Sequence, residues 1–191
     1  RSMDAFATAH VPRSTFIGLD GNFAPWVGAM IVDVKQPILL VTDQDKVEEA
    51  ITRLSRVGFD HVLGYLEGGI AEWKKAGMEV DAITSVGAEE FSRLRKNSDI
   101  KVIDVRKPGE YLSEHIVEAE SIPLVALNGH LAEIPAEGDF YLHCLSGYRS
   151  LIAMSILKAR GFHNGTNVLG GFNAIKETDT PLSDYVCPST L

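Results

Sequence analysis

The hydrophobic positions of the chain fall into two kinds of segment. Short apolar runs alternate with longer stretches in which apolar residues recur every three or four positions. The first kind predicts buried strands, and the second predicts amphipathic helices. On this basis strands are expected at 37–41, 100–106 and 140–142, and helices at 46–56, 86–94 and 150–158. Strands that alternate with helices predict an α/β fold, in which helices cover both faces of a parallel sheet.

The pattern occurs twice along the chain. A strand, a helix and a Gly-Phe pair are followed by a Gly-Gly pair, which is Gly68-Gly69 in the first copy and Gly170-Gly171 in the second. Glycine at such a position permits a positive φ or a close approach of the backbone, and an ordinary turn is the alternative. The repeat therefore predicts two related domains.

The two copies differ in their opening part. The second copy is preceded by the helix at 86–94, for which Ser85 is the expected N-cap, and by a buried strand that ends in polar residues. The first copy lacks both. We therefore expect an incomplete domain over residues 1–80 and a complete domain over residues 81–191, each a parallel sheet flanked by helices.

Composition excludes several classes of function. Hydrophobic residues make up 45% of the 191 residues, which suits a packed core. The chain carries 26 acidic and 18 basic residues, for a formal net charge of −8. An acidic chain argues against nucleic acid or an anionic membrane as a partner. No apolar run approaches the length of a membrane span.

Cysteine and histidine usage adds two expectations. The chain has two cysteines, Cys144 and Cys187, and the second lies four residues before Leu191. Their placement argues against a disulfide framework and favours a reducing cytoplasm. The six histidines show no metal-ligand spacing, so neither a metal nor another cofactor is expected.

The most informative stretch is the loop 144–149, with the sequence Cys-Leu-Ser-Gly-Tyr-Arg. It joins an apolar strand to an apolar helix, so Cys144 should face the free N–H groups at a helix N-terminus. That environment favours the thiolate, which is the nucleophilic form of cysteine. Arg149 adds a positive charge and a planar set of donors for an anion. A buried structural thiol is the alternative, but the arginine at this spacing favours a functional loop.

These residues resemble the rhodanese homology family of sulfurtransferases. Residues 82–182 are similar to one complete domain, and residues 1–80 resemble one without its opening strand and helix. The resemblance extends to the C-terminal tandem part of bacterial proteins that begin with a metallo-β-lactamase-fold persulfide dioxygenase. It therefore implies such a domain, N-terminal to this chain, as a candidate partner. The matching features are Asp104-Val105-Arg106, Glu110-Tyr111, His115-Ile116, the loop 144–149 and Val168-Leu169-Gly170-Gly171-Phe172.

The resemblance implies covalent sulfur transfer. Cys144 would take the outer sulfur of a donor as a persulfide and pass it to a thiol or to cyanide. Arg149 would hold the loop and supply charge. Asp104 and Arg106 would support the neighbouring strand ends, with purely structural ion pairing as the alternative. The residues expected to bind the substrate are Leu145, Ser146, Gly147 and Tyr148.

The donor is expected to be thiosulfate or a low-molecular-weight thiol persulfide such as glutathione persulfide. Arg149 is the single basic residue of the loop, so the dianion thiosulfate gains less attraction than two cations would give. Two other functions stay open, a cysteine phosphatase and a non-enzymatic module that binds a partner. The Cys-x4-Arg spacing argues against the phosphatase, because the related dual-specificity phosphatases have a loop one residue longer.

The first domain is expected to be catalytically inactive. Asp43 stands where its strand would deliver a cysteine, and no arginine closes the loop that follows. A carboxylate cannot form a persulfide and would repel an anionic substrate.

Overall fold

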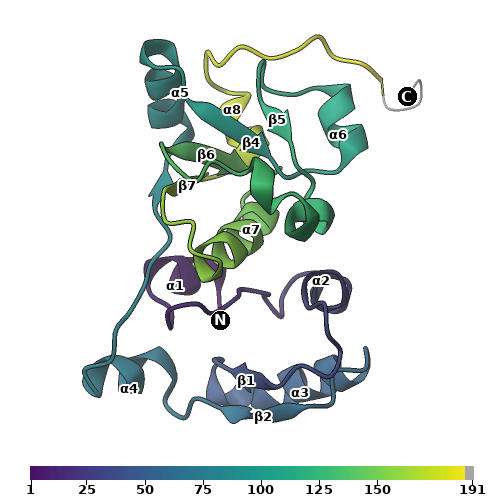
Figure 1. The fold of residues 1–191 in the computed structure, drawn as a ribbon, viewed down its shortest axis with the longest axis vertical. Coiled ribbons are helices and arrows are strands. Elements are labelled where there is room, and N and C mark those ends of the chain that lie inside the picture. The colour runs from purple at the N-terminus through teal and green to yellow at the C-terminus, as the bar shows by residue number, and fades with distance from the viewer. Residues whose placement is uncertain (188–191) are drawn as a thin grey trace. The chain divides into compact units, whose positions relative to one another are not determined.

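The computed structural model describes residues 1–187, and the chain divides into two compact units (Figure 1). The first unit is Arg1–Ala82, and the second begins at Ile83. Both contain parallel strands connected by helices. The α/β class and the parallel pairing predicted from the hydrophobic pattern are therefore confirmed.

The first unit is built on a two-stranded parallel sheet. Its helices pack on the sheet through a small core formed by Phe23, Val27, Leu54 and Phe59. Its elements are α1 (Met3–Thr8), α2 (Phe23–Met30), β1 (Ile38–Leu40), a 3₁₀ turn (Gln44–Lys46), α3 (Val47–Ser55), β2 (Val62–Tyr65) and α4 (Gly69–Lys75).

The second unit contains a five-stranded sheet in the order β3-β7-β6-β4-β5, and every pair in it is parallel. Because the strands run the same way, their carboxyl ends lie along one edge. Its strands are β3 (Ser85–Val86), β4 (Lys101–Asp104), β5 (Glu120–Ser121), β6 (Phe140–His143) and β7 (Gly165–Val168). Its helices are α5 (Ala88–Asn97), α6 (Pro108–Ser113), two 3₁₀ helices (Leu124–Gly129 and Leu131–Glu133), α7 (Tyr148–Ala159) and α8 (Gly171–Ile175).

Helices cover both faces of this sheet (Figure 1). On one face α5 and α8 pack together, and Tyr141 of β6 meets Phe91 of α5 with ring centroids 5.7 Å apart. On the other face lies α7, which is buried from Ser150 through Leu157. A helix that is apolar on all sides belongs in the middle of a fold, and its first turn is thereby held rigidly at the end of β6.

The expectation that Ser85 caps a helix is wrong. Ser85 and Val86 form β3 and pair with Asn167 and Val168 of β7. The helix begins later, with Gly87 at its N-cap position. Val86 also packs against the core cluster on the α5 and α8 face, and its pairing with Val168 favours the extended conformation. The apolar period alone could not separate the two conformations for so short a segment.

Within residues 1–187, no helix combines the length and the apolar character needed to cross a membrane.

Candidate active site

Cys144 lies at the carboxyl end of β6, the middle strand of the sheet. The chain then turns through Gly147, whose φ of 109° lies in the region that favours glycine, and α7 starts at Tyr148. The Gly147 N–H donates a hydrogen bond to Cys144 Sγ at 3.1 Å. This bond holds the sulfur at the N-terminus of the helix, where the first N–H groups have no partner inside the helix.

The sulfur is sheltered, because Cys144 exposes 1% of its surface. Leu145 and Ser146, the next two residues, are exposed, whereas Tyr148 is half-buried in the first turn of α7. These are three of the four residues that the sequence predicted to surround a substrate, and the fourth is Gly147.

The loop backbone is held by the start of α8. The N–H of Phe172 donates to the carbonyl of Cys144 at 2.7 Å, and the N–H of Asn173 donates to that of Leu145 at 3.0 Å. The first N–H groups of a helix have no partner inside it, so these bonds satisfy both segments. The close approach of α8 to the loop backbone depends on Gly171, which has a φ of 58°. A Cβ at this position would lie 2.4 Å from the Cys144 carbonyl oxygen.

Gly171→Ala is therefore expected to destabilise the fold and to displace the loop. The methyl group adds a clash with rigid backbone to the strain of a positive φ, so we expect a loss of about 2 kcal/mol or more. Urea unfolding measures it. Gly138→Ala is the matched control, because Gly138 has a φ of 73° and open space around its Cα. Equal losses in the two variants would show that contact with the loop contributes nothing.

Arg149 makes a two-pronged ion pair with Glu110 of α6. Its Nη1 donates to Oε2 at 2.6 Å, and its Nη2 donates to Oε1 at 2.8 Å. The pair lowers the pKa of Glu110 and raises that of Arg149. The Lys107 N–H also donates to Glu110, at 3.0 Å, so one carboxylate joins the start of α6 to the start of α7. The guanidinium donors expected to face an anion are thus directed to a protein carboxylate.

Asp104 and Arg106 form a buried ion pair at the end of β4. The guanidinium donates to both carboxylate oxygens, with Nε–Oδ1 at 3.0 Å and Nη2–Oδ2 at 2.6 Å. It also donates to the carbonyl of Glu114 at 2.8 Å and lies 3.9 Å from the centroid of the Phe172 ring. These contacts tie β4, α6 and α8 together, so the geometry favours the structural alternative for this pair.

His143 precedes the cysteine but faces the other side of the sheet, near the Phe172 ring. Burial lowers the pKa of its imidazole, so the ring is neutral. Its Nδ1 lies 3.2 Å from the carbonyl oxygen of Cys144, which requires the Nδ1–H tautomer as donor. The ring thus supports the backbone of the nucleophile.

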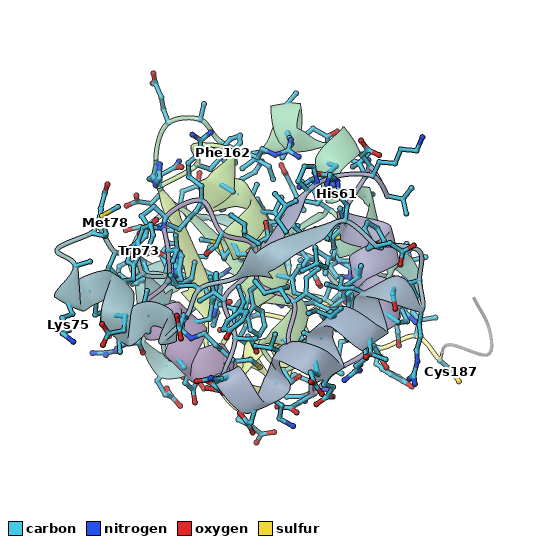
Figure 2. All side chains as sticks on the ribbon, turned by 90° about the horizontal axis from the view of Figure 1, so that it is seen from below. His61, Trp73, Lys75, Met78, Phe162 and Cys187 are labelled. Carbon is cyan, nitrogen blue, oxygen red and sulfur yellow. The ribbon has the colours of Figure 1, made fainter. Side chains whose placement is uncertain are left out.

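The second cysteine and the possible metal ligands are the remaining candidate groups. Neither cysteine is in a disulfide, and Cys187 is exposed on the C-terminal tail (Figure 2). Within residues 1–187, no group of three or more histidine, cysteine or acidic side chains is arranged to hold a metal ion.

The order β1, α3, β2 and α4 in the first unit is the same alternation of strand and helix as β6, α7, β7 and α8 in the second. Its Gly68-Gly69 pair has φ angles of 70° and 58°, against 74° and 58° for Gly170-Gly171. Leu40 pairs with Tyr65, three residues before the first glycine, just as Leu142 pairs with Asn167.

Counting forward from these paired residues shows which residue of the first unit stands at the position that Cys144 has in the second. Two residues after Leu142 comes Cys144, and two residues after Leu40 comes Thr42. Thr42 rather than Asp43 therefore corresponds to Cys144, one residue earlier than the sequence comparison indicated. Asp43 corresponds to Leu145, and it precedes the 3₁₀ turn. The shift arose because the loop lengths of the two units differ, which sequence counting alone could not locate.

Known proteins are similar to part of this chain, and the family match lies within the second unit. Residues 87–178 match the family model of the rhodanese-like domain. A sulfurtransferase of Allochromatium vinosum is 29% identical over 101 residues, which cover 52% of this chain and 94% of that protein. An uncharacterized protein of Bacillus subtilis, YqhL, is 38% identical over 72 residues, which cover 38% of this chain and 57% of that protein.

Two further comparisons each cover about half of this chain. An uncharacterized protein of Synechocystis, slr1261, is 33% identical over 99 residues. These cover 51% of this chain and 54% of that protein. A rhodanese-related protein from Thermoplasma volcanium aligns with a TM-score of 0.48 and 26% identity, over 52% of this chain and 97% of that one. The family match, together with the sheet and the loop described above, supports a rhodanese-like domain in the second unit.

Proposed function

We propose that the second unit is a sulfurtransferase that carries sulfane sulfur as a persulfide on Cys144. The observation that carries this proposal is the position of Sγ, at the N-terminus of α7 and 3.1 Å from the Gly147 N–H. The sulfurtransferase of Allochromatium vinosum, whose match covers nearly all of that protein, supports the same class of reaction.

The proposed reaction has two balanced steps. The Cys144 thiolate attacks the outer sulfur of a thiol persulfide, the donor S–S bond breaks, and the donor leaves as a thiolate. The outer sulfur and its proton now form Cys144–S–SH. An acceptor thiolate then attacks that sulfur and regenerates the Cys144 thiolate. With thiosulfate as donor the leaving group is sulfite, and with cyanide as acceptor the product is thiocyanate.

We favour a thiol persulfide over thiosulfate as the donor. Arg149 is the basic residue of the loop, and both of its Nη atoms donate to Glu110. A paired guanidinium attracts a dianion less than a free one, because the carboxylate offsets its charge. Leu145, which is exposed beside the nucleophile, offers apolar contact that an organic donor can use.

We further propose that the first unit is an inactive rhodanese-like domain. The matching glycine angles and strand register support common ancestry, and Thr42 supplies a hydroxyl where the second unit has a thiol. A hydroxyl cannot carry sulfane sulfur as a persulfide. The resemblance to the fusion proteins adds a metallo-β-lactamase-fold domain, N-terminal to this chain, as a proposed partner, and the cytoplasm as the proposed location.

Mass spectrometry tests the proposed function directly. After exposure to glutathione persulfide, the peptide that contains Cys144 should gain about 32 Da, the mass of one sulfur atom, and should lose it on treatment with cyanide or a reducing thiol. Absence of this adduct in a folded protein, with either donor, would remove the basis for the enzyme and favour a partner-binding module.

Leu145→Arg is expected to improve the use of thiosulfate. The added guanidinium places an unpaired cation beside the nucleophile, so kcat/KM for thiosulfate should rise by about threefold or more at low ionic strength. The gain should shrink as salt is added, since screening weakens the attraction. Steady-state assays at two salt concentrations measure both effects. A gain that is independent of salt would contradict the electrostatic explanation.

A further inference from the structure

The opening segment of the first unit repeats the geometry of the segment that follows β4 in the second. One separation along the chain relates α1 to α6, Arg13 to Glu118, and Arg1 to Arg106. Arg13 and Glu118 both have a φ of 65°, and no other described residue except glycine has a positive φ. Such an angle is uncommon outside glycine, so the two residues mark the same turn. Arg1 therefore holds the position of Arg106, which follows β4 in the second unit.

Side-chain contacts support this correspondence. The rings of Phe6 and His10 stack with their centroids 4.2 Å apart, and those of Tyr111 and His115 stack at 3.9 Å. In each pair the histidine Nδ1 lies close to the carbonyl oxygen of the other ring residue, at 2.9 Å and 2.8 Å. The same separation along the chain relates the two pairs, so one arrangement occurs in both units.

The two arginines make the same backbone contact but differ in their counter-charge. Arg1 donates to the carbonyl of Ala9 at 2.9 Å, and Arg106 donates to that of Glu114 at 2.8 Å, eight residues further on in each case. Arg106 also pairs with Asp104, the last residue of β4. Among the described residues, the Arg1 guanidinium bonds to two backbone carbonyls and to no carboxylate. Burial lowers the pKa of Arg1, so a carboxylate beside it would stabilise its charge.

β1 offers a free edge to a further strand. In the second unit β6 lies between β7 and β4, whereas β1 pairs with β2 alone in the part of the chain that the structure describes. The N–H of Ile38 and the carbonyl of Leu40 bond toward β2. The backbone groups of successive residues in a strand point to opposite edges, so those of Leu39 and Val41 point away from β2.

A cavity of about 320 Å³ accompanies this edge. It is lined by residues 36–42, which contain β1, and by residues 14–17. The separation that relates Arg1 to Arg106 also relates residues 15–16 to β5. In the second unit β4 lies between β6 and β5. The cavity therefore lies where the first unit would hold a strand like β4, and Arg1 is among the residues that line it.

We propose that this cavity is a docking site for a parallel β-strand that runs into Arg1 from its N-terminal side, is apolar along its length and carries a carboxylate two positions before Arg1. The carboxylate pairs with the guanidinium as Asp104 pairs with Arg106, and the strand backbone bonds to the free edge of β1. Apolar residues fit because Val27 and Leu54 line the cavity and a parallel strand inside a sheet is covered on both faces. This site belongs to the first unit and does not depend on sulfur chemistry.

The test joins a copy of residues 100–105, Ile-Lys-Val-Ile-Asp-Val, to the N-terminus of the full chain. The added aspartate then stands two positions before Arg1. Amide hydrogen exchange at Leu39 and Val41, read by NMR, should slow by about tenfold or more, because both N–H groups gain partners. The amides of β6 are the internal control, since β6 already pairs with β4 and β7.

Two changes test the role of the carboxylate. An extension with asparagine in place of its aspartate keeps the shape of the side chain without the charge and should lose most of the added protection. Arg1→Gln in the extended chain should lose it as well. Arg56→Gln is the matched control, because Arg56 is exposed and is not among the residues that line the cavity. It removes the same charge and should leave the exchange at Leu39 and Val41 as in the extended chain.

Three results would contradict the proposal. Unchanged exchange at Leu39 and Val41 in a folded extended chain would overturn the docking site. Equal protection by the aspartate and asparagine extensions would overturn the pairing with Arg1. Protection that appears without the extension and rises with protein concentration would assign the cavity to a second copy of the chain. If the β6 amides show that the extended chain does not fold, the same six residues are added as a separate peptide with the same readout.

Discussion

Cys144→Ser is expected to abolish sulfur transfer, with activity falling to the uncatalysed rate. The serine hydroxyl keeps the shape of the side chain, but it is neither ionised near neutral pH nor able to hold sulfane sulfur. The Gly147 N–H, which donates to Sγ, would still have an acceptor, so the fold should be preserved. Steady-state assays with both donors, together with urea unfolding, separate lost chemistry from lost structure.

Cys187→Ser is the control, because it makes the same substitution at the other cysteine. Cys187 is exposed on the tail, and a direct role in transfer would require it to exchange sulfur with Cys144. We expect this variant to keep most of the wild-type activity. Loss of activity in folded Cys187→Ser would show that sulfur passes through both cysteines and would change the assignment of the nucleophile.

The loop was predictable because its chemistry is local. Strand, nucleophile, turn and helix follow one another within 140–159, so the apolar pattern and the Cys-x4-Arg spacing describe the site without knowledge of the fold. The same holds for the α/β class, since alternating strands and helices leave few arrangements other than a parallel sheet.

The groups that support the loop were not predictable, because they come from distant parts of the chain. Glu110 lies 39 residues from Arg149, and nothing in either local pattern links them. The role of Gly171 was predictable in part. The Gly-Gly pair indicated a close approach of the backbone, but it did not indicate that the group approached is the carbonyl of Cys144.

The predictions for short segments were wrong for a different reason. Val86 fits either the end of a strand or the start of a helix, and pairing with β7 decides between them. The correspondence of Thr42 with Cys144 likewise needed the strand register. In both cases the deciding contact is a backbone hydrogen bond between segments, which leaves no mark on side-chain periodicity.

Arg149→Lys is expected to lower kcat/KM by about tenfold or more, equivalent to at least about 1.4 kcal/mol of barrier. Lysine keeps the charge, but it cannot hold both carboxylate oxygens of Glu110 as the planar guanidinium does. The first turn of α7 would then be less firmly tied to α6, and the loop that presents Cys144 would lose its fixed position. Arg53→Lys is the matched control, since Arg53 pairs with Glu49 in the first unit at 3.0 Å.

Glu110→Gln separates two explanations for that loss. If Arg149 acts by holding the loop through Glu110, this variant should lose activity with both donors, because the carboxylate that joins α6 to α7 is gone. If Arg149 acts as a counter-charge for the donor, the same variant frees its guanidinium and should raise the use of thiosulfate. The geometry favours the first outcome, because the guanidinium places both of its terminal nitrogens on Glu110. A clear gain with thiosulfate would instead make Arg149 a binding residue that Glu110 restrains.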